Sequence, residues 1–206
     1  MTRDTQRRGE ELRTHILFVA KSVFLEAGFE RASMDTVATR AGTSKRSLYA
    51  HFESKDKLFL AVLDLVRELY LGKLMTPAAY ADEPAEAVTR FCGRFQQLIL
   101  WEPQVRTCRL SISVAERLPG SAHAYFDAVF AATHERLRDY LAQNYELDAA
   151  SVAEDLLART TLPRLYRTLL AVAEPLTEEP DEKALAGHVD LDAIRRVVTA
   201  TLPDRR

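Results

Sequence analysis

The chain has 206 residues, of which 47% are hydrophobic and 28% are charged, so it is long enough to bury a core in one or two domains. Its formal net charge of −2 excludes binding to nucleic acid through an overall basic excess. Residues 1–58, however, hold 11 Lys and Arg against 8 Asp and Glu, and this local excess favours an anionic partner at the amino end.

The two cysteines, Cys92 and Cys108, are too few for a disulfide framework and form no CxxC pair for a metal. They favour a reducing compartment. The first residues, MTRDTQRRGEELR, carry charges where a signal peptide needs an apolar run, and the chain has no run of about 18 apolar residues. We therefore expect a cytoplasmic protein with no membrane span, no cofactor and no metal.

The amino-terminal quarter predicts four helices. A first helix, ending at Gly28, is indicated by apolar residues at steps of three and four: Leu12, Ile16, Ala20, Val23, Phe24 and Ala27. Ser33, Ser44 and Ser54 are typical N-cap residues and predict the starts of the second, third and fourth helices. Gly42 is the expected end of the second helix.

Helical spacing continues to the carboxyl end of the chain. The expected helices are 83–101, 104–116, 120–144, 149–172 and 190–202. Pro163 should kink its helix or shift its start. Residues 174–187 hold two prolines and several acids, which indicates a loop. No segment has the alternation of a strand, so the fold class is all-α.

Two short helices on either side of Gly42-Thr43-Ser44 are typical of a helix-turn-helix, in which the second helix lies in the major groove of DNA. A helix of about two turns is unstable alone. The first and fourth helices should therefore support it through a small core that includes Val37, Leu48 and Phe52.

The run FLEAGFERASMDTVATRAGTSKRSLYAHFESKDKLFLAV, residues 24–62, resembles the amino-terminal DNA-binding domain of the TetR/AcrR (tetracycline-repressor-like) transcriptional regulators. The resemblance covers about a quarter of the chain in detail. The matching residues are Phe24, Gly28, Phe29, Ser33, Val37, Ala38, Ala41, Gly42, Ser44, Leu48, Tyr49, His51, Phe52, Lys55 and Leu58. Residues 102–128 more faintly resemble the carboxyl-terminal domain of one subgroup.

The resemblance implies a three-helix DNA-binding domain with a helix-turn-helix at 1–56, and an all-helical bundle at 57–206 that binds an effector and dimerises. It implies a homodimeric repressor that binds near-palindromic double-stranded operator DNA and is released by a small molecule. The fourth helix, which starts at Lys55, is the expected lever. Thr43 and Arg46 depart from the residues most frequent in the family, so no relative's operator can be assumed.

The predicted DNA-binding residues lie in and around the third helix. Lys45 and Arg46 suit the O6 and N7 acceptors of guanine, and Tyr49 is expected to pack its ring inward with its hydroxyl near a phosphate. Adjacent basic residues also occur on ordinary solvated faces, and Arg7 and Arg8 fit either a disordered tail or a minor-groove arm. The predicted set is Thr36, Thr43, Ser44, Lys45, Arg46, Tyr49, His51 and Lys55.

Aromatic residues in the later helices predict an apolar or aromatic effector, although they would equally serve a filled core. The predicted pocket residues are Phe91, Phe95, Leu98, Trp101, Cys108, Phe126, Phe130, His134 and Tyr166. Apolar stripes on the last two long helices predict a dimer interface or ordinary core: Leu156, Leu169, Leu170, Ile194, Val197, Val198 and Leu202.

Two other classes of function stay open. His123, Asp127 and His134 share a helix face, but a rise of about 1.5 Å per residue separates the two histidines by about 16 Å, too far to hold one zinc ion. The chain has no GxSxG, HExxH, Walker or GxGxxG motif. A helical scaffold or adaptor is therefore the main alternative, and an enzyme is the weaker one.

Overall fold

A computed structural model describes the backbone of residues 3–203 and the side chains from Arg7 onward. The described chain is helical and forms no strand, which confirms the all-α prediction. One isolated parallel bridge joins Trp101 and Leu176. The chain divides into two compact units: a first unit of residues 1–68 and 109–125, and a second unit of residues 69–108 and 126–206. None of the described helices is long and apolar enough to cross a membrane.

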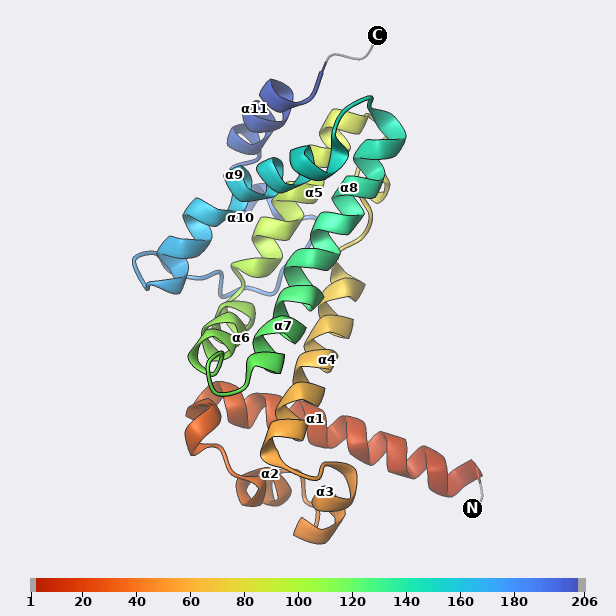
Figure 1. Cartoon of the computed structure of the whole chain (residues 1–206), viewed down its shortest axis with the longest axis vertical. Helices are drawn as coiled ribbons and strands as arrows, with labels where there is room; N and C mark the ends of the chain where they lie inside the picture. The colour runs from red at the N-terminus through yellow and green to blue at the C-terminus, as the bar shows by residue number, and fades with distance from the viewer. Residues whose placement is uncertain (1–2, 204–206) are drawn as a thin grey trace. The chain divides into compact units, whose positions relative to one another are not determined.

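The first unit contains the four helices predicted from the amino-terminal sequence, drawn in red to orange in Figure 1. They are α1 (Arg3–Arg31), α2 (Met34–Arg40), α3 (Lys45–His51) and α4 (Lys55–Lys73), whose last residues belong to the second unit. Gly28 has φ +76° and interrupts α1, as its predicted stop role requires. Arg7 and Arg8 lie within α1 and are helical rather than a disordered tail.

Aromatic rings form the centre of the first unit. Phe24 stacks on Phe29 with ring centroids 5.8 Å apart, and Phe59 meets each of them edge-on at 5.1 Å. The predicted supports Val37, Leu48 and Phe52 are also buried. The two short helices are therefore held by a core that α1 and α4 complete.

The remaining helices agree closely with the sequence pattern. They are η1 (Pro77–Ala79), α5 (Pro84–Ile99), α6 (Glu102–Ser113), α7 (Pro119–Phe126), the π-helical turn η2 (Asp127–Ala131), α8 (Ala132–Asn144), α9 (Ala149–Leu169), α10 (Leu185–His188) and α11 (Leu191–Thr201). The predicted helix 120–144 is thus interrupted by a π-helical turn. Pro163 lies inside α9 and does not shift its start.

Helix α5 is the centre of the second unit and contacts α8, α9, α10, α11 and η1 (Figure 1). At Gly93 an added Cβ would lie 2.7 Å from Leu191 Cδ2, so a larger residue would require the Leu191 side chain of α11 to move. Thirteen residues of α5 are buried, among them Arg94, Gln96 and Gln97. Such polar residues require internal partners because water does not reach them.

The polar residues of α5 bind the carboxyl-terminal segment. Gln97 Nε2 donates to Asp181 O at 2.9 Å and lies 2.7 Å from His188 Nδ1, while Gln97 Oε1 accepts from Arg94. Arg94 Nε also donates to Lys73 O at 3.3 Å. This network attaches the predicted loop 174–187 to the core of the second unit.

Two predictions differ from the structure. The predicted boundary at 56/57 differs from the division into units, since residues 57–68 and 109–125 group with the amino-terminal helices. Among the predicted interface residues, Leu156, Ile194, Val198 and Leu202 are buried in their own protomer, so they form core. Leu170, which is 76% exposed, and the half-buried Leu169 and Val197 remain accessible.

Candidate DNA-binding surface

The turn between α2 and α3 has the geometry that a helix-turn-helix needs. Gly42 has φ +61°, in the left-handed region, and directly follows the last residue of the α2 cap, Ala41. Thr43 N donates to Ala38 O at 3.0 Å and Gly42 N to Thr39 O at 3.2 Å. This pair of bonds is a Schellman motif, which ends α2 and reverses the chain toward α3.

Helix α3 is oriented by one cap and one buried side chain. Ser44 Oγ accepts from Ser47 N at 3.1 Å and so satisfies a free amide at the first turn. Leu48 is fully buried, whereas Lys45, Arg46 and Tyr49 on the other face are exposed. The helix therefore presents its basic and aromatic residues to the outside.

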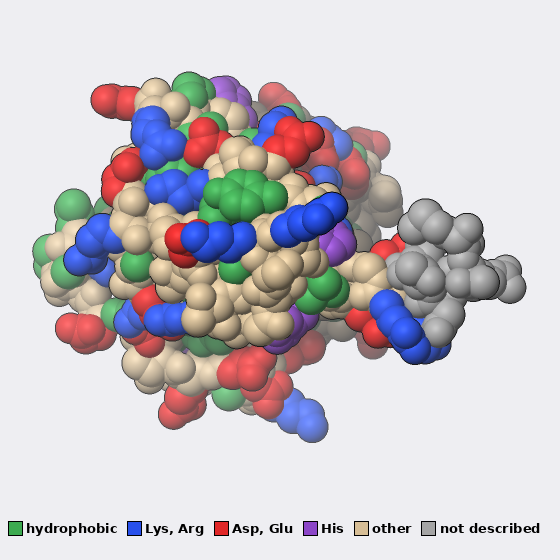
Figure 2. Space-filling view, turned by 90° about the horizontal axis from the view of Figure 1, so that it is seen from below, with side chains coloured by type: hydrophobic (Ala, Val, Ile, Leu, Met, Phe, Trp, Pro, Cys, Tyr) green, Lys and Arg blue, Asp and Glu red, His purple; other side chains and the backbone are tan. Residues whose placement is uncertain are grey.

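Figure 2 views the molecule from below and shows Lys and Arg side chains scattered over a mostly polar face, with some acidic side chains among them. At the start of α3, Lys45 forms an ion pair: its Nζ is 2.6 Å from Oδ2 of Asp35, in the first turn of α2. Arg46 has no ion-pair partner among the residues that the structure describes. The two adjacent basic residues thus differ in how freely they can contact a ligand.

The other predicted contacts fall into three groups. Thr36 and Ser44 are exposed and cap or flank a helix start, since Ser33 Oγ accepts from Thr36 N at 3.1 Å. Thr43 and His51 are half-buried, and the His51 ring lies 6.3 Å from that of Phe52. Tyr49 is 48% exposed, so its ring does not pack inward as expected.

Lys55 has a different environment from the one predicted. Its ammonium donates to Phe29 O at 2.9 Å and to Glu30 O and Ala32 O at 3.2 Å, and it lies 4.5 Å from the centroid of the Phe29 ring. These three bonds use all its hydrogens to satisfy the carbonyl groups at the end of α1. We therefore replace the predicted phosphate contact of Lys55 with a structural role.

Sequence reasoning missed Arg13. Its guanidinium carbon lies 5.1 Å from the centroid of the Phe52 ring, the C-cap of α3. This places an exposed basic residue of α1 next to the end of α3. Its position on the polar side of the predicted first helix was the only available signal, and many surface arginines share it.

Arg117 links three parts of the first unit. Its guanidinium donates to Glu30 Oε1 at 2.8 Å and to Asp56 Oδ1 at 2.9 Å, and it lies 4.5 Å from the centroid of the Phe29 ring. The hydrogen bond from Arg117 lowers the pKa of Glu30 below its ordinary value. Residues 109–125 are thereby attached to the end of α1 and the start of α4.

The predicted effector residues differ in burial and in their printed contacts. Phe91, Phe95, Leu98 and Cys108 are buried, whereas Phe126 and Tyr166 are 58% and 57% exposed. His134 Nε2 lies 3.0 Å from Ala150 O, at the junction of α8 and α9. The centroid of the Trp101 ring lies 5.0 Å from Lys73 Nζ. Three rings do form a series, since Phe126 stacks on Phe130 at 5.8 Å and Phe130 meets Phe95 at 6.1 Å.

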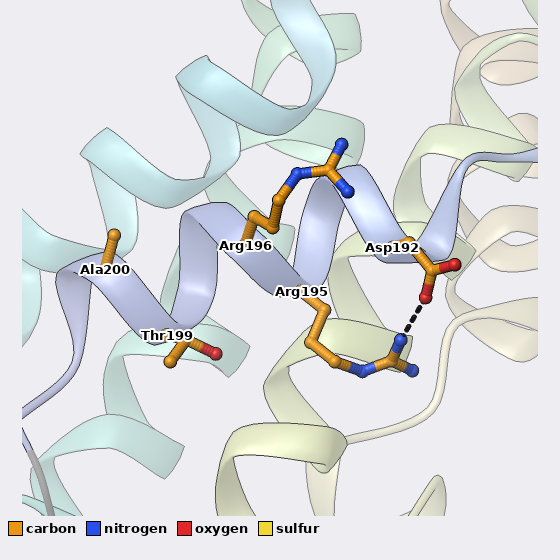
Figure 3. A pocket seen from close by; sticks show the side chains of 5 residues that line it. All are labelled: Asp192, Arg195, Arg196, Thr199 and Ala200. Atoms are coloured by element: carbon orange, nitrogen blue, oxygen red, sulfur yellow. Dashed lines mark hydrogen bonds and ion pairs between the residues drawn. The ribbon is translucent and has the colours of Figure 1, made fainter.

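A hollow of about 600 Å³ lies on α11, and Figure 3 shows the side chains that line it. It is lined by Asp192, Arg195, Arg196, Thr199 and Ala200. Arg195 is held by Asp192 at 2.5 Å and by Glu86 at 3.1 Å. Because all five residues belong to one helix, they make a single wall and not the enclosed pocket in which small molecules bind.

The chain matches two family models. Residues 16–62 match the model described as bacterial regulatory proteins of the tetR family. Residues 86–191, about half of the chain, match the carboxyl-terminal domain of AefR-like transcriptional repressors. The first match contains α2 and α3, and the second begins within the first turn of α5 and ends at Leu191, the first residue of α11.

Curated relatives match part of the chain. The transcriptional activator FasR of Mycolicibacterium smegmatis is 50% identical over 54 residues, which are 26% of this chain and 25% of FasR. The repressor BepR of Brucella suis is 33% identical over 82 residues, 40% of this chain and 39% of BepR. The chain thus matches between a quarter and two fifths of the length of these relatives.

Solved structures share the fold over nearly the whole chain. A TetR-family regulator from Mesorhizobium loti has a TM-score of 0.76 at 20% identity, covering 97% of this chain and 98% of its own. The flavonoid-responsive regulator FrrA has a TM-score of 0.72 at 23% identity, covering 95% and 100%. Together with the family matches and the helix-turn-helix geometry, these likenesses show that the chain belongs to the TetR/AcrR family of transcriptional regulators, which are not enzymes.

Proposed function

We propose that the chain is a homodimeric repressor that binds a near-palindromic operator and is released by a small-molecule effector. The observation that carries this proposal is the exposed face of α3, with Lys45, Arg46 and Tyr49 outward and Leu48 buried. A helix held in this way can enter the major groove as a rigid element. Since relatives include both an activator and a repressor, the sign of regulation rests on the AefR-like match.

Base reading is assigned to the first turn of α3. Arg46 is exposed and unpaired among the described residues, so its guanidinium can form two bonds to guanine O6 and N7. Thr36, Thr43, Ser44, Tyr49 and His51 are assigned to phosphates, which position the protein without reading sequence. Arg13 joins this group because it lies beside the C-cap of α3.

Dimerisation is assigned to the outer faces of α9 and α11. Tyr166 and Leu170 are exposed on α9, and the hollow in Figure 3 lies on α11. Arg159 Nη1 of α9 donates to Thr201 Oγ1 of α11 at 3.1 Å, so these two faces adjoin. Side chains from a second copy would cover the exposed apolar groups and fill the hollow, and two copies would present two α3 helices to successive major grooves.

The effector site is assigned to the region of the Phe95, Phe130 and Phe126 rings. This series runs from a buried to an exposed ring and ends at the π-helical turn η2. Turns of this kind are frequent at functional sites because the extra residue weakens the helix locally. The proposed effector is apolar or aromatic, since its binding would replace contacts among the rings of Phe95, Phe130 and Phe126.

Residues 109–125 are the proposed route of the response. They lie within the stretch that matches the carboxyl-terminal family model, yet they group with the DNA-binding helices, where Arg117 holds them. An effector can act only if it binds one arrangement more tightly than another. Any shift of α6 or α7 would reach α1 and α4 through this attachment.

The test begins with selection of duplexes from a random library by the purified protein. The expected product is a sequence with two half-sites about 34–36 Å apart. Light scattering should give twice the monomer mass of 23.3 kDa, and Leu170→Asp should shift the molar mass toward the monomer. Failure to enrich any sequence would refute the reading function, and a stable wild-type monomer would refute the dimer.

Selected duplexes then allow a search for the effector. A library of aromatic small molecules is screened for release of the operator and for a rise in the melting temperature. Ligand at a hundred times its Kd should add about 2.7 kcal/mol to the free energy of unfolding. Phe130→Ala should weaken that effect, whereas Tyr166→Ala should not.

The proposed place of action is the cytoplasm, where a bacterial regulator meets chromosomal DNA. Expression of a fluorescent fusion and its overlap with the nucleoid would test this assignment. A fusion found only at the cell envelope would refute it.

A further inference from the structure

The start of the recognition helix holds one basic residue that is neutralised and one that is free. Lys45, the first residue of α3, pairs with Asp35 at 2.6 Å, and Arg46 beside it is unpaired among the described residues. No acidic residue lies in the first turn of α3 itself. The neighbouring helix α2 therefore supplies the negative charge that this turn lacks.

The helix dipole explains the pairing. The amino end of a helix carries a partial positive charge, so Lys45 at the first position of α3 is placed unfavourably. Asp35 is favourably placed in the first turn of α2 and offsets the charge of Lys45 at the same time. The carboxylate of Asp35 thus interacts favourably with the amino end of α2 and also offsets the positive charge of Lys45 at the amino end of α3.

The exposure of the pair decides how it responds to DNA. The side chains of Lys45 and Asp35 are 64% and 60% exposed, so water and salt weaken their attraction. DNA phosphates can compete for Lys45, but Asp35 opposes their approach by its own charge. A DNA sequence that offers Lys45 no better partner than Asp35 gains little from this lysine.

We propose that Asp35 is a specificity-determining residue, which neutralises Lys45 on non-cognate DNA and so lowers non-specific affinity. This inference rests on the proposed reading function of α3. Non-specific affinity comes almost entirely from charge, whereas cognate affinity also includes contacts to base edges. Removing the charge of Asp35 should therefore strengthen non-specific binding more than operator binding and reduce discrimination.

A matched control is available in the same unit. Glu26 of α1 forms an equally exposed ion pair with Arg40 at 2.5 Å, with side chains 53% and 48% exposed, and neither residue belongs to α3. Asp35→Asn and Glu26→Gln remove the same charge from comparable pairs. Only Asp35→Asn frees a residue of the recognition helix, because Arg40 lies in α2.

The experiment measures affinity by fluorescence anisotropy for the selected operator and for a duplex of unrelated sequence, from 50 to about 300 mM salt. Asp35→Asn should raise non-specific affinity about 2–5-fold, the range of an exposed ion pair. The slope of log affinity against log salt on that duplex should steepen by about 0.9. Operator affinity should change less, and Glu26→Gln should leave the ratio of the two affinities unchanged.

Lys45→Gln completes a double-mutant cycle. It should reduce non-specific affinity more in the Asp35→Asn background than in the wild type, because only there is the lysine free. Asp35→Glu keeps the charge and should retain wild-type discrimination between the operator and the unrelated duplex. Comparison with this variant shows whether the effect of Asp35→Asn comes from the lost charge or from a folding defect. Melting temperatures of all variants are measured first.

The outcomes separate the inference from the proposed function. Equal gains from Asp35→Asn and Glu26→Gln, or no coupling between Asp35 and Lys45, would overturn the inference. If the wild type enriched no operator, the reading function would fail, and the role of Asp35 would still be decided by non-specific affinity and its salt slope.

Discussion

The helix-turn-helix of the first unit and helix α5 of the second unit use polar residues in different ways. Around the helix-turn-helix they cap helices or lie at the surface, as Ser33, Ser44 and Arg46 do. In the second unit Arg94, Gln96 and Gln97 are buried within α5 and bind partners far along the chain. Surface positions near a turn can be inferred from spacing, but buried networks depend on which distant segments meet. The difference also predicts where substitutions affect stability and where they affect binding.

The largest effect is expected from the buried network. Arg94→Ala leaves the buried Gln97 Oε1 and the part-buried Lys73 O without this donor. Each buried unsatisfied group costs about 1–3 kcal/mol, so the free energy of unfolding should fall by about 2–4 kcal/mol. Urea denaturation measures it. Arg106→Ala, which breaks an exposed pair with Glu102, is the control and should cost less than about 0.5 kcal/mol.

Lys55 tests whether a basic residue near α3 stabilises the fold or binds DNA. It lies in the first unit, but its ammonium group donates to backbone carbonyl groups at the end of α1. Lys55→Met removes three bonds to carbonyl groups at the end of α1 and should lower the free energy of unfolding by about 1–2 kcal/mol. The salt slope of operator binding should stay unchanged. A slope reduced by about 0.9 with unchanged stability would instead restore the phosphate contact predicted from the sequence.

Arg117 should have a smaller effect on stability. Its side chain is 45% exposed, so Arg117→Gln should lower the free energy of unfolding less than Lys55→Met does, because solvent screens exposed ion pairs. The proposed coupling gives it a second measurable effect: an effector that releases wild-type protein from the operator should release the variant less completely. Arg138→Gln, whose residue pairs with its neighbour Asp139, is the control. Equal release of both variants and the wild type would contradict the coupling.

The smallest effect is the titration of Glu30. Its pKa lies below the ordinary value of 4.5 because Arg117 donates a hydrogen bond to it. The folded state therefore favours the ionised carboxyl, and this stabilisation is complete above pH 4.5 and is lost as the pH falls through the lowered pKa. NMR titration of the Glu30 carboxyl carbon measures the shift, and Arg117→Gln should move the pKa back toward 4.5. A wild-type midpoint at 4.5 would show that the bond does not form in solution.

The sequence predicted the helices of both units well, because caps and apolar periods are local signals. Ser33 and Ser44 cap the helices that they were expected to start. Gly42, with a positive φ, follows the end of α2, and Gly28, also with a positive φ, interrupts α1 before its last residue, Arg31. Helical periodicity does not distinguish a residue buried in its own protomer from one on an outer face. Leu156 and Leu170 lie in the same predicted stripe, and one is core while the other is exposed.

Side-chain partners were predicted less well because they depend on the tertiary fold. Nothing in the spacing of Lys45 or Lys55 shows that the first faces Asp35 and the second faces the carbonyl groups of Phe29, Glu30 and Ala32. Arg117 lies 61 residues from Asp56 in sequence, so their ion pair was also outside the reach of local patterns. The predicted pocket stays a prediction, and of its aromatic residues Phe95, Phe126 and Phe130 do contact one another in series.

The proposed reading of base sequence by Arg46 of α3 is tested most directly with the variant Arg46→Ala. Its affinity is measured for the selected operator and for single-base variants of that operator. We expect Arg46→Ala to lose about 1–3 kcal/mol of binding free energy on the operator and to relax the base preference at one base pair, with the other positions discriminated as before. An equal loss on every sequence would contradict it, because Arg46 would then contact the phosphate backbone and read no base.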